Sequence, residues 1–268
     1  MRDTCSTTYP VLLLHGLAYR DDMFCIESWG RIPARLEAAG CSVFLGELEA
    51  WSPIEQNAAL LCDRVAAILK ETGAGKVNLL GHSKGGLEAR FAVSRLGLAE
   101  RVASVTTVCT PHHGTYIADV ASALTPYHLM PQGVARNLLA RLMGDRQPQS
   151  VTCLQELTRL AMARFNLHVP DIPGVYYQSF GTAMKRVADD PVFTLSYESL
   201  KLHDGENDGI VAATSCRWAD FRGIIPTKVT GEGISHLAIT DFRQKDVAGV
   251  DIPAVYVGIV RDLKDRGF

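Results

Sequence analysis

The feature that most constrains the fold of this 268-residue chain is a glycine-flanked serine between a strand and a helix. Residues 77–80 are an apolar run typical of a buried strand, the sequence GHSKGG follows, and a helical pattern comes next. A sharp strand-to-helix turn of this kind lifts the serine hydroxyl clear of the sheet. Gly81 and Gly85 let the backbone pass closely, and we expect a strained conformation at Ser83. A solvated glycine turn is the alternative, because the five-residue pattern alone arises by chance in many chains.

Strand and helix patterns alternate along most of the chain. Four apolar runs are typical of buried strands: residues 11–14, 41–45, 77–80 and 102–108. Strand character returns at 175–180 and again at 224–229, and residues 253–263 predict a closing amphipathic helix. The alternation predicts an α/β fold with a mostly parallel central sheet flanked by helices on both faces.

The segment from residue 111 to residue 169 lacks strand signals and has helical spacing instead. We therefore expect a helical insertion at about residues 115–170, lying over the carboxyl ends of the strands. The length is compatible with a single α/β domain that spans residues 1–268.

The sequence also marks the bounds of one long helix. Ser52 is expected to cap its N-terminus, with Pro53 at the first helical position and Glu55 placed to complete a capping box. Apolar residues then repeat every three or four positions, and Gly73 supplies the left-handed C-terminal cap.

Composition and charge exclude several classes of protein. Hydrophobic residues make up 47% of the chain and charged residues 21%, which excludes disorder, collagen and coiled coil as the main architecture. The net charge is -2 and acidic and basic residues are interleaved, so we expect no nucleic-acid partner. No apolar run approaches the ~20 residues that a transmembrane helix needs. The seven cysteines show no CxxC spacing and are interpreted mostly as buried thiols.

A serine becomes a nucleophile only when a base removes its proton, so a histidine oriented by a carboxylate is required. Where the serine lies on such a turn, the acid and then the histidine follow it in the chain. His168, His203 and His236 lie beyond the strand after the serine, and only His236 lies beyond the best acidic stretch. It occupies a glycine-rich loop, a position from which a base can reach the carboxyl edge of the sheet. A merely solvated loop histidine is the alternative.

Three carboxylates in the turn-rich stretch 203–211 compete for the orienting role: Asp204, Glu206 and Asp208. A plain acidic turn is the simplest alternative interpretation of this stretch. A calcium-binding loop is disfavoured, because the later glutamate and the spacing of an EF-hand are missing.

Two backbone N–H groups are candidates for binding a developing oxyanion. Leu17 follows the first predicted strand, and Lys84 comes directly after the serine. Because these are backbone roles, the identity of either side chain matters little. We interpret His15 and His82, which neighbour these positions, as structural turn residues rather than bases.

Five segments together resemble the bacterial triacylglycerol lipases of the Pseudomonas and Burkholderia type, which have the α/β-hydrolase fold. They are residues 9–17, 76–86, 110–115, 163–166 and 207–211. The resemblance implies hydrolysis of acyl esters, with Ser83 as nucleophile, His236 as base and Asp208 as the orienting carboxylate. The implied substrates are acylglycerols or similar lipid esters, with transient contact to a lipid interface. The mechanism needs no cofactor.

The sequence departs from the family's pattern in three respects. Family members are exported with a signal peptide, and none is visible here, so the chain as written is expected to be cytoplasmic; it would be secreted if a leader had been removed. Two ligands of the family's structural calcium are replaced by Ala238 and Phe242, so we predict that no calcium site exists. The family's lid segment corresponds to residues 115–146. Its apolar residues face either an acyl chain or the core: Ala118, Leu124, Leu129, Met130 and Leu138.

Other functions remain open at the level of sequence. A thioesterase or an acyltransferase would use the same three side chains with a different leaving group or acceptor. A hydrolase-fold protein that binds an apolar ligand without turnover is the alternative from another class. A complete set of serine, histidine and aspartate disfavours that reading. A peptidase has no support from the five segments.

Overall fold

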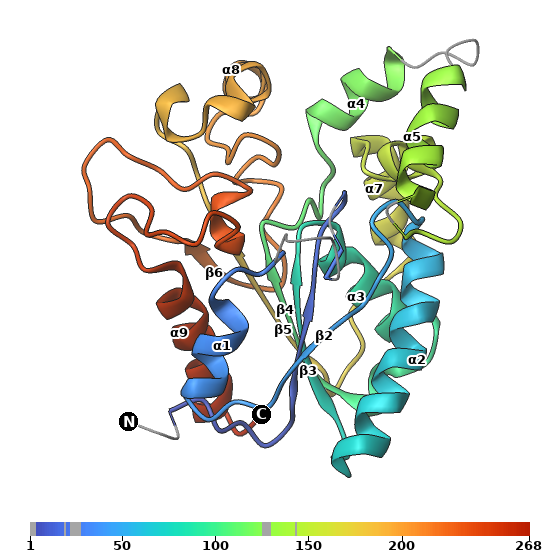
Figure 1. Ribbon diagram of the computed structural model, residues 1–268, viewed down its shortest axis with the longest axis vertical. Helices are drawn as coiled ribbons and strands as arrows, with labels where there is room; N and C mark the ends of the chain where they lie inside the picture. The colour runs from blue at the N-terminus through green and yellow to red at the C-terminus, as the bar shows by residue number, and fades with distance from the viewer. Residues whose placement is uncertain (1–3, 19, 22–27, 125–129, 143) are drawn as a thin grey trace.

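The computed structural model describes residues 4–18, 20–21, 28–124, 130–142 and 144–268. Its centre is a six-stranded sheet with the strand order β2-β1-β3-β4-β5-β6, and each pair of neighbours is parallel. The strands are β1 (Val11–Leu14), β2 (Val43–Leu45), β3 (Val77–His82), β4 (Val102–Val108), β5 (Tyr176–Gly181) and β6 (Asp220–Ile224). Helices lie on both sides of this sheet (Figure 1). The predicted α/β class and mostly parallel sheet are confirmed.

Two hydrophobic clusters hold the layers together. On one face, Val11 and Leu13 of β1 pack with residues of α1 (Ile32–Ala38) and α9 (Ile252–Asp265). On the other, Leu12 and Leu14 pack with α2 (Ile54–Thr72) and α3 (Lys84–Arg95). Successive side chains of a strand point to opposite faces, so a central strand covered on both sides is apolar at every position. Within the described residues, no helix has the length and apolar character to cross a membrane.

The segment between β4 and β5 is helical, as predicted. It contains α4 (Tyr116–Ala123), α5 (Met130–Leu142), α6 (Ser150–Glu156) and α7 (Arg159–His168). Ala118 belongs to a hydrophobic cluster, whereas Leu124 and Leu138 are 69% and 59% exposed. Leu129 and the side chain of Met130 lie outside the described residues. α8 (Thr194–His203) was not predicted. Short 3-10 turns occur at Leu98–Arg101, Val187–Asp189, Pro191–Phe193 and Ala238–Thr240.

The predicted capping box before α2 is wrong. The helix starts at Ile54, and Pro53 rather than Ser52 takes the N-cap position. A carboxylate oxygen of Glu156, from α6, accepts the Ile54 N–H at 3.0 Å. A partner from another helix thus satisfies the N–H donor that Ser52 was expected to cap. The predicted end is confirmed, because Gly73 is left-handed with φ 70°.

The last predicted strand is misplaced. Residues 224–229 were expected to be extended, but the strand is β6 and ends at Ile224. Pro226 has no N–H to donate to a sheet, which opposes a strand across it. Among the described strands, β6 pairs with β5 alone, and its side chains are exposed or half-buried. It therefore lacks the apolar pattern of a buried strand.

Candidate active site

Ser83 lies at the junction of β3 and α3 with φ 54° and ψ -127°, a strained conformation for a residue with a side chain. The two predicted glycines are sterically required. A Cβ atom on Gly81 would lie 2.5 Å from a backbone nitrogen of α3, and one on Gly85 would lie 2.5 Å from the carbonyl oxygen of Leu14. The strained serine is therefore held between a strand and a helix that approach as closely as their backbones allow.

The structure brings the three predicted side chains into contact. His236 Nε2 lies 2.9 Å from Ser83 Oγ, and His236 Nδ1 lies 2.7 Å from a carboxylate oxygen of Asp208. The other Asp208 oxygen accepts N–H groups of Ile210 and Val211 at 2.9 and 2.7 Å. With the proton on Nδ1 donated to Asp208, Nε2 is free to accept from the serine hydroxyl. All three side chains are buried.

The competing residues lie elsewhere. Asp204 forms an ion pair with Arg159 at 3.3 Å, and the exposed Glu206 pairs with Lys185 at 2.5 Å. His168 and His203 each bond a backbone carbonyl one turn earlier in their own helices. Among the candidates, only Asp208 and His236 approach the serine.

The two candidate oxyanion donors flank Ser83. Lys84 is the first residue of α3, where backbone N–H groups have no partner within the helix. Leu17 lines the pocket that contains Ser83 and His236. A Cβ atom on the preceding residue, Gly16, would lie 3.3 Å from Ser83 Oγ, so this loop passes directly beside the hydroxyl.

The Lys84 side chain is buried and anchors the turn from below. Its ammonium donates to the Ser52 carbonyl at 2.6 Å and pairs with the Glu88 carboxylate. Burial by itself lowers the pKa of Lys84, but the charge of Glu88, its hydrogen bond and the other acidic groups nearby together outweigh burial and raise that pKa. Asn57 donates to the same Glu88 oxygen at 2.7 Å. This charged lysine links α2, α3 and the loop between β2 and α2.

His15 and His82 occupy structural positions, as expected. The ring nitrogens of His15 lie 2.9 and 3.0 Å from the carbonyl oxygens of Gly16 and Leu48. His82 Nε2 lies 3.0 Å from the carbonyl oxygen of His236. Burial lowers the pKa of His82 well below its ordinary value, so this imidazole is neutral and holds the histidine loop by hydrogen bonding.

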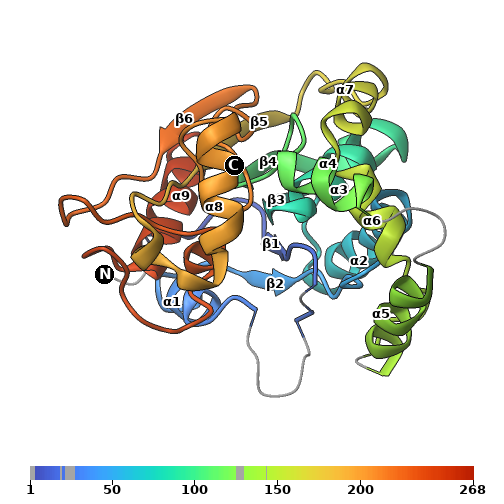
Figure 2. The ribbon, with the colours of Figure 1, turned by 90° about the horizontal axis from the view of Figure 1, so that it is seen from above.

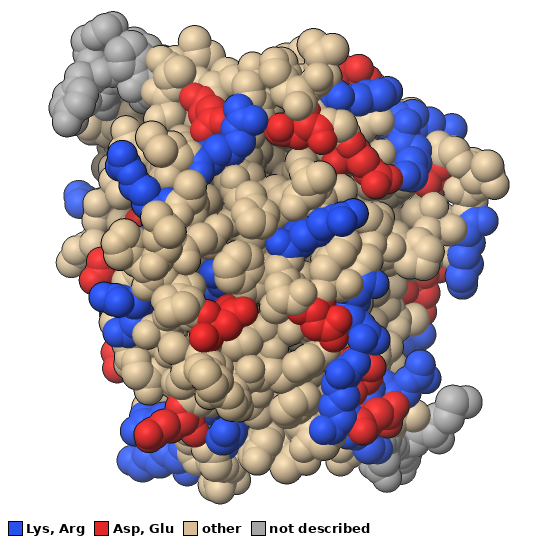
Figure 3. Space-filling view, turned by 180° about the vertical axis from the view of Figure 1, so that it is seen from behind, with Lys and Arg blue, Asp and Glu red and all other residues tan. Residues whose placement is uncertain are grey.

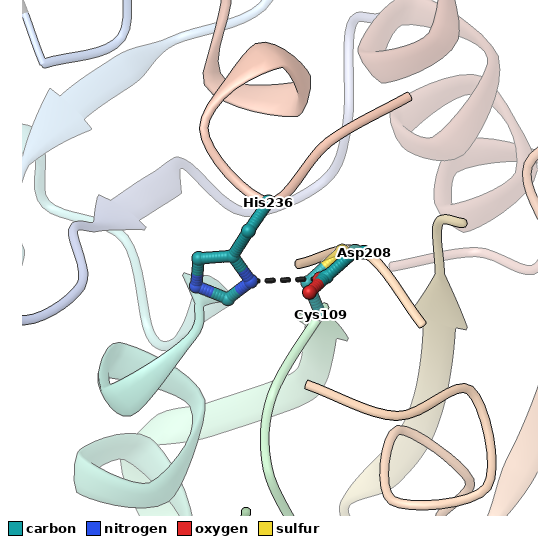
Figure 4. A group of neighbouring side chains, drawn as sticks. All are labelled: Cys109, Asp208 and His236. Atoms are coloured by element: carbon teal, nitrogen blue, oxygen red, sulfur yellow. Dashed lines mark hydrogen bonds and ion pairs between the residues drawn. The ribbon is translucent and has the colours of Figure 1, made fainter. Parts of the chain in front are cut away.

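A buried thiol adjoins the histidine and the aspartate. Figure 4 shows Cys109 next to Asp208, with His236 on the other side of the dashed contact to the carboxylate. One ligand atom from each of Cys109, Asp208 and His236 lies within 4.8 Å of the other two. These three side chains could bind Zn²⁺ only if the Cys109 sulfur were a thiolate. Burial, a hydrogen bond with Cys216 and the charge of Asp208 raise the pKa of Cys109, which favours the neutral thiol.

A pocket of about 190 Å³ opens beside Ser83 and His236. Its walls are mainly apolar, with side chains from Leu17, Trp29, Leu157, Phe193, Ile210 and Leu237. Trp29 also packs edge-on against the His82 ring, with centroids 6.4 Å apart. The arrangement suits an apolar group whose reacting carbon lies against Ser83 Oγ.

Sequence reasoning missed two buried groups around the histidine. Cys109 directly follows β4 and has φ 52°, and nothing in its sequence context distinguishes it from the other cysteines. Asp190 is fully buried beside the histidine loop and pairs with Arg243 at 2.8 Å. Because Asp190 lies 46 residues before His236 in the sequence, only the fold shows that it adjoins the histidine loop.

Comparison with known proteins extends these observations. The sequence profile of the alpha/beta hydrolase fold family matches residues 9–178. The chain belongs to the α/β-hydrolase family. A triacylglycerol lipase of Pseudomonas fragi is 31% identical over 252 residues, which cover 80% of this hydrolase and 84% of the relative. A triacylglycerol lipase of Vibrio cholerae is 29% identical over 233 residues, or 78% and 74%.

The fold comparison agrees with the sequence comparison. The crystal structure of Staphylococcus hyicus lipase superimposes on the hydrolase with a TM-score of 0.73, covering 99% of both chains at 14% identity. The resemblance to bacterial lipases is thereby confirmed, and the hydrolase is a carboxylic ester hydrolase. The profile match includes Ser83 but ends before Asp208 and His236, so the structure supplies their geometry.

Proposed function

We propose that the hydrolase cleaves lipid esters such as acylglycerols through an acyl-enzyme on Ser83. The observation that carries this proposal is the position of His236, which contacts Ser83 Oγ at 2.9 Å and Asp208 at 2.7 Å. Ser83 Oγ attacks the ester carbonyl carbon while His236 Nε2 takes the hydroxyl proton. The C–O bond to the alcohol then breaks, and His236 returns the proton to the leaving oxygen. Water, deprotonated by His236, releases the acid.

Asp208 holds the imidazole in the required tautomer and stabilises its positive charge. The backbone N–H groups of Leu17 and Lys84 bind the oxyanion of each tetrahedral intermediate. A single donor of this type is worth ~3 kcal/mol in the transition state. The buried Lys84–Glu88 pair keeps one of these donors in place without entering the reaction.

The apolar pocket supports an acyl chain as the substrate group bound next to Ser83. The surface near it supports transient contact with a lipid interface. Phe193 lines the pocket, while its neighbours Val192 and Leu195 are 73% and 87% exposed. Figure 1 shows α8, which carries Leu195, above α1 and α9, and Figure 2 shows α5 on the other side of the molecule from α8. α5 adds four exposed apolar side chains: Val134, Leu138, Leu139 and Leu142.

The proposed chemistry needs no metal. Two buried carboxylates near the histidine loop are already paired with arginine. Asp241 accepts two guanidinium hydrogen bonds from Arg31, each at 2.8 Å, and Asp190 accepts one from Arg243 at 2.8 Å. Internal guanidinium groups therefore supply the positive charge these carboxylates require.

The test is hydrolysis of nitrophenyl esters, from acetyl to palmitoyl, by the wild-type protein and by Ser83→Ala. We expect turnover by the wild type and a loss of at least ~1000-fold in the variant. The chain-length optimum then separates an esterase from a lipase. Equal inactivity of both proteins on every ester would contradict the proposal. Faster turnover of matched thioesters, or transfer to added alcohols, would indicate the thioesterase or the acyltransferase instead.

A further inference from the structure

The loop that carries His236 is held by charged side chains outside the set formed with Ser83 and Asp208. The side chain of Asp190 is fully buried, and one of its oxygens accepts a hydrogen bond from Ser235 Oγ at 2.7 Å. Its other oxygen accepts one from Arg243 Nη2 at 2.8 Å. A single carboxylate thus joins the residue directly before His236 to an arginine seven positions after it.

Ser235 uses its hydroxyl in both directions. While Oγ donates to Asp190, it also accepts the backbone N–H of Ala238 at 3.1 Å. One atom, Ser235 Oγ, therefore bonds both the Asp190 carboxylate and the Ala238 N–H, on either side of His236 in the turn. A carboxylate buried this deeply is stable only when it is paired and hydrogen-bonded, and here Ser235 and Arg243 provide those partners.

Backbone contacts fix the approach to this turn. The Ile234 N–H donates to the Ala183 carbonyl at 3.0 Å, and the His236 N–H donates to the Asp208 carbonyl at 2.8 Å. A Cβ atom on Gly233 would lie 2.3 Å from the Ala183 oxygen, so the loop packs directly against this backbone and has no room for a side chain there. In addition to these contacts and to the His82 hydrogen bond, the Ser235–Asp190 bond closes the turn around the histidine.

We propose that Ser235, Asp190 and Arg243 are positioning residues that keep the His236 imidazole aligned with Ser83, with the Arg243 guanidinium as a built-in cation. The proposal rests on the function proposed above. None of the three is among the residues that line the described pocket, so their loss alters kcat rather than KM. Displacement of a reacting group by about 1 Å costs roughly 100-fold in rate.

The first test compares Ser235→Ala with Ser104→Ala. Ser104 is an equally buried serine whose hydroxyl donates to a side-chain oxygen at the same distance, 2.7 Å, but it lies in β4 and bonds Asn78. We expect kcat for a nitrophenyl ester to fall ~10- to 100-fold in Ser235→Ala with KM little changed. Ser104→Ala should lose similar stability and keep its kcat. Equal kcat in the two variants, or a loss confined to KM, would overturn the proposal.

The second test is chemical rescue of Arg243→Ala. The Arg243 side chain is 35% exposed, so a small cation from solvent can reach the site that truncation opens. Millimolar guanidinium chloride should restore much of the lost kcat, and Arg243→Lys should retain more activity than Arg243→Ala. Tetramethylammonium chloride at the same concentration should restore the kcat of neither Arg243→Ala nor Arg243→Lys. Guanidinium should not change the kcat of Ser235→Ala.

Two outcomes oppose the proposal in this experiment. A folded Arg243→Ala protein that guanidinium does not reactivate would show that the charge has no positioning role. Equal reactivation of Ser235→Ala would show a general solvent effect. If Arg243→Ala does not fold, the serine pair decides alone. A wild-type protein without ester turnover would instead refute the proposed function, which separates the two failures.

Discussion

The chemistry of this hydrolase depends on one imidazole with two different neighbours. His236 can accept a proton from Ser83 only while its Nδ1 proton is held by Asp208, at 2.7 Å. The Asp208 carboxylate is itself fixed by two backbone N–H groups on its other oxygen. The orientations of the His236 and Asp208 side chains are therefore each determined by a contact away from the reacting atoms.

Asp208→Asn tests this dependence. An amide nitrogen facing Nδ1 would donate rather than accept, which favours the tautomer that cannot take the serine proton. We expect kcat to fall about 10⁴-fold with little change in KM. Glu206→Gln is the matched control, because Glu206 lies nearby in the same turn but is exposed and paired with Lys185. Comparable losses in both variants would show that the acid is wrongly assigned.

Site residues that belong to a motif, or to a fixed order of catalytic groups along the chain, were predictable from the sequence. Residues that reach the site only by tertiary contacts were not. Ser83 and His236 follow from the turn and from the order of acid and base along the chain. Asp208 needed the family resemblance, because three carboxylates fit the residue pattern equally well. Asp190 and Cys109 reach the histidine loop only through tertiary packing, and neither belongs to a motif.

The same contrast between predictable and unpredictable parts holds for the helices and strands around the site. β1, β3 and β4 are buried at every position and are rich in aliphatic and β-branched residues, so their patterns predict them within two residues. β6 lies at the sheet edge and α8 exposes Leu195 and Leu202, so neither carries the apolar pattern of a buried element. Ser52 does not cap α2, because a carboxylate oxygen of Glu156 in α6 accepts the Ile54 N–H instead.

Gly85→Ala tests the fit between β1 and α3. The added methyl group would lie 2.5 Å from the Leu14 and His15 carbonyl oxygens, so strand and helix must separate. We expect the free energy of unfolding to fall by about 1–3 kcal/mol, together with a loss of activity as Ser83 shifts from Gly16. Gly75→Ala is the control, since its methyl group meets no atom within 4 Å. Urea unfolding should leave Gly75→Ala near the wild type; similar losses in both would contradict the packing argument.

At the scale of the whole molecule, the protein combines a mainly apolar pocket at the site with a mixed-charge surface. On the face in Figure 3, acidic and basic side chains are interspersed among uncharged residues. Six cysteines are free among the described residues, and five of them are buried. The predicted buried thiols are confirmed for that part of the chain.

Buried histidines make the stability of the folded protein sensitive to acid. Burial lowers the pKa values of His82 and His112 well below 6.5, aided by the charges of His236 and Arg90 respectively. Below about pH 6.5 the unfolded chain binds protons that the folded protein refuses. The free energy of unfolding should therefore fall with pH by up to about 1.4 kcal/mol per unit for each group.

Urea unfolding at about pH 7.5 and about pH 5.5 measures this slope. His112→Gln should flatten it, because glutamine takes up no proton in either state. An identical slope in the wild-type protein and in His112→Gln would contradict the assignment of the acid sensitivity to His112.

Removal of divalent cations tests the prediction that no calcium site exists. Because Arg31 and Arg243 already neutralise the buried carboxylates near His236, chelation by EDTA should change neither the melting temperature nor the rate of ester hydrolysis. A clear loss of either, restored by added calcium, would show a metal site that these arginines do not replace.

The central claim is that Ser83 is the activated nucleophile, and covalent labelling tests it most directly. A fluorophosphonate probe reacts with a serine that an adjacent base has activated. We predict one adduct per chain, located at Ser83 by mass spectrometry, absent from Ser83→Ala and formed far more slowly in His236→Ala. An adduct on a different residue, or undiminished labelling of Ser83→Ala, would contradict the account.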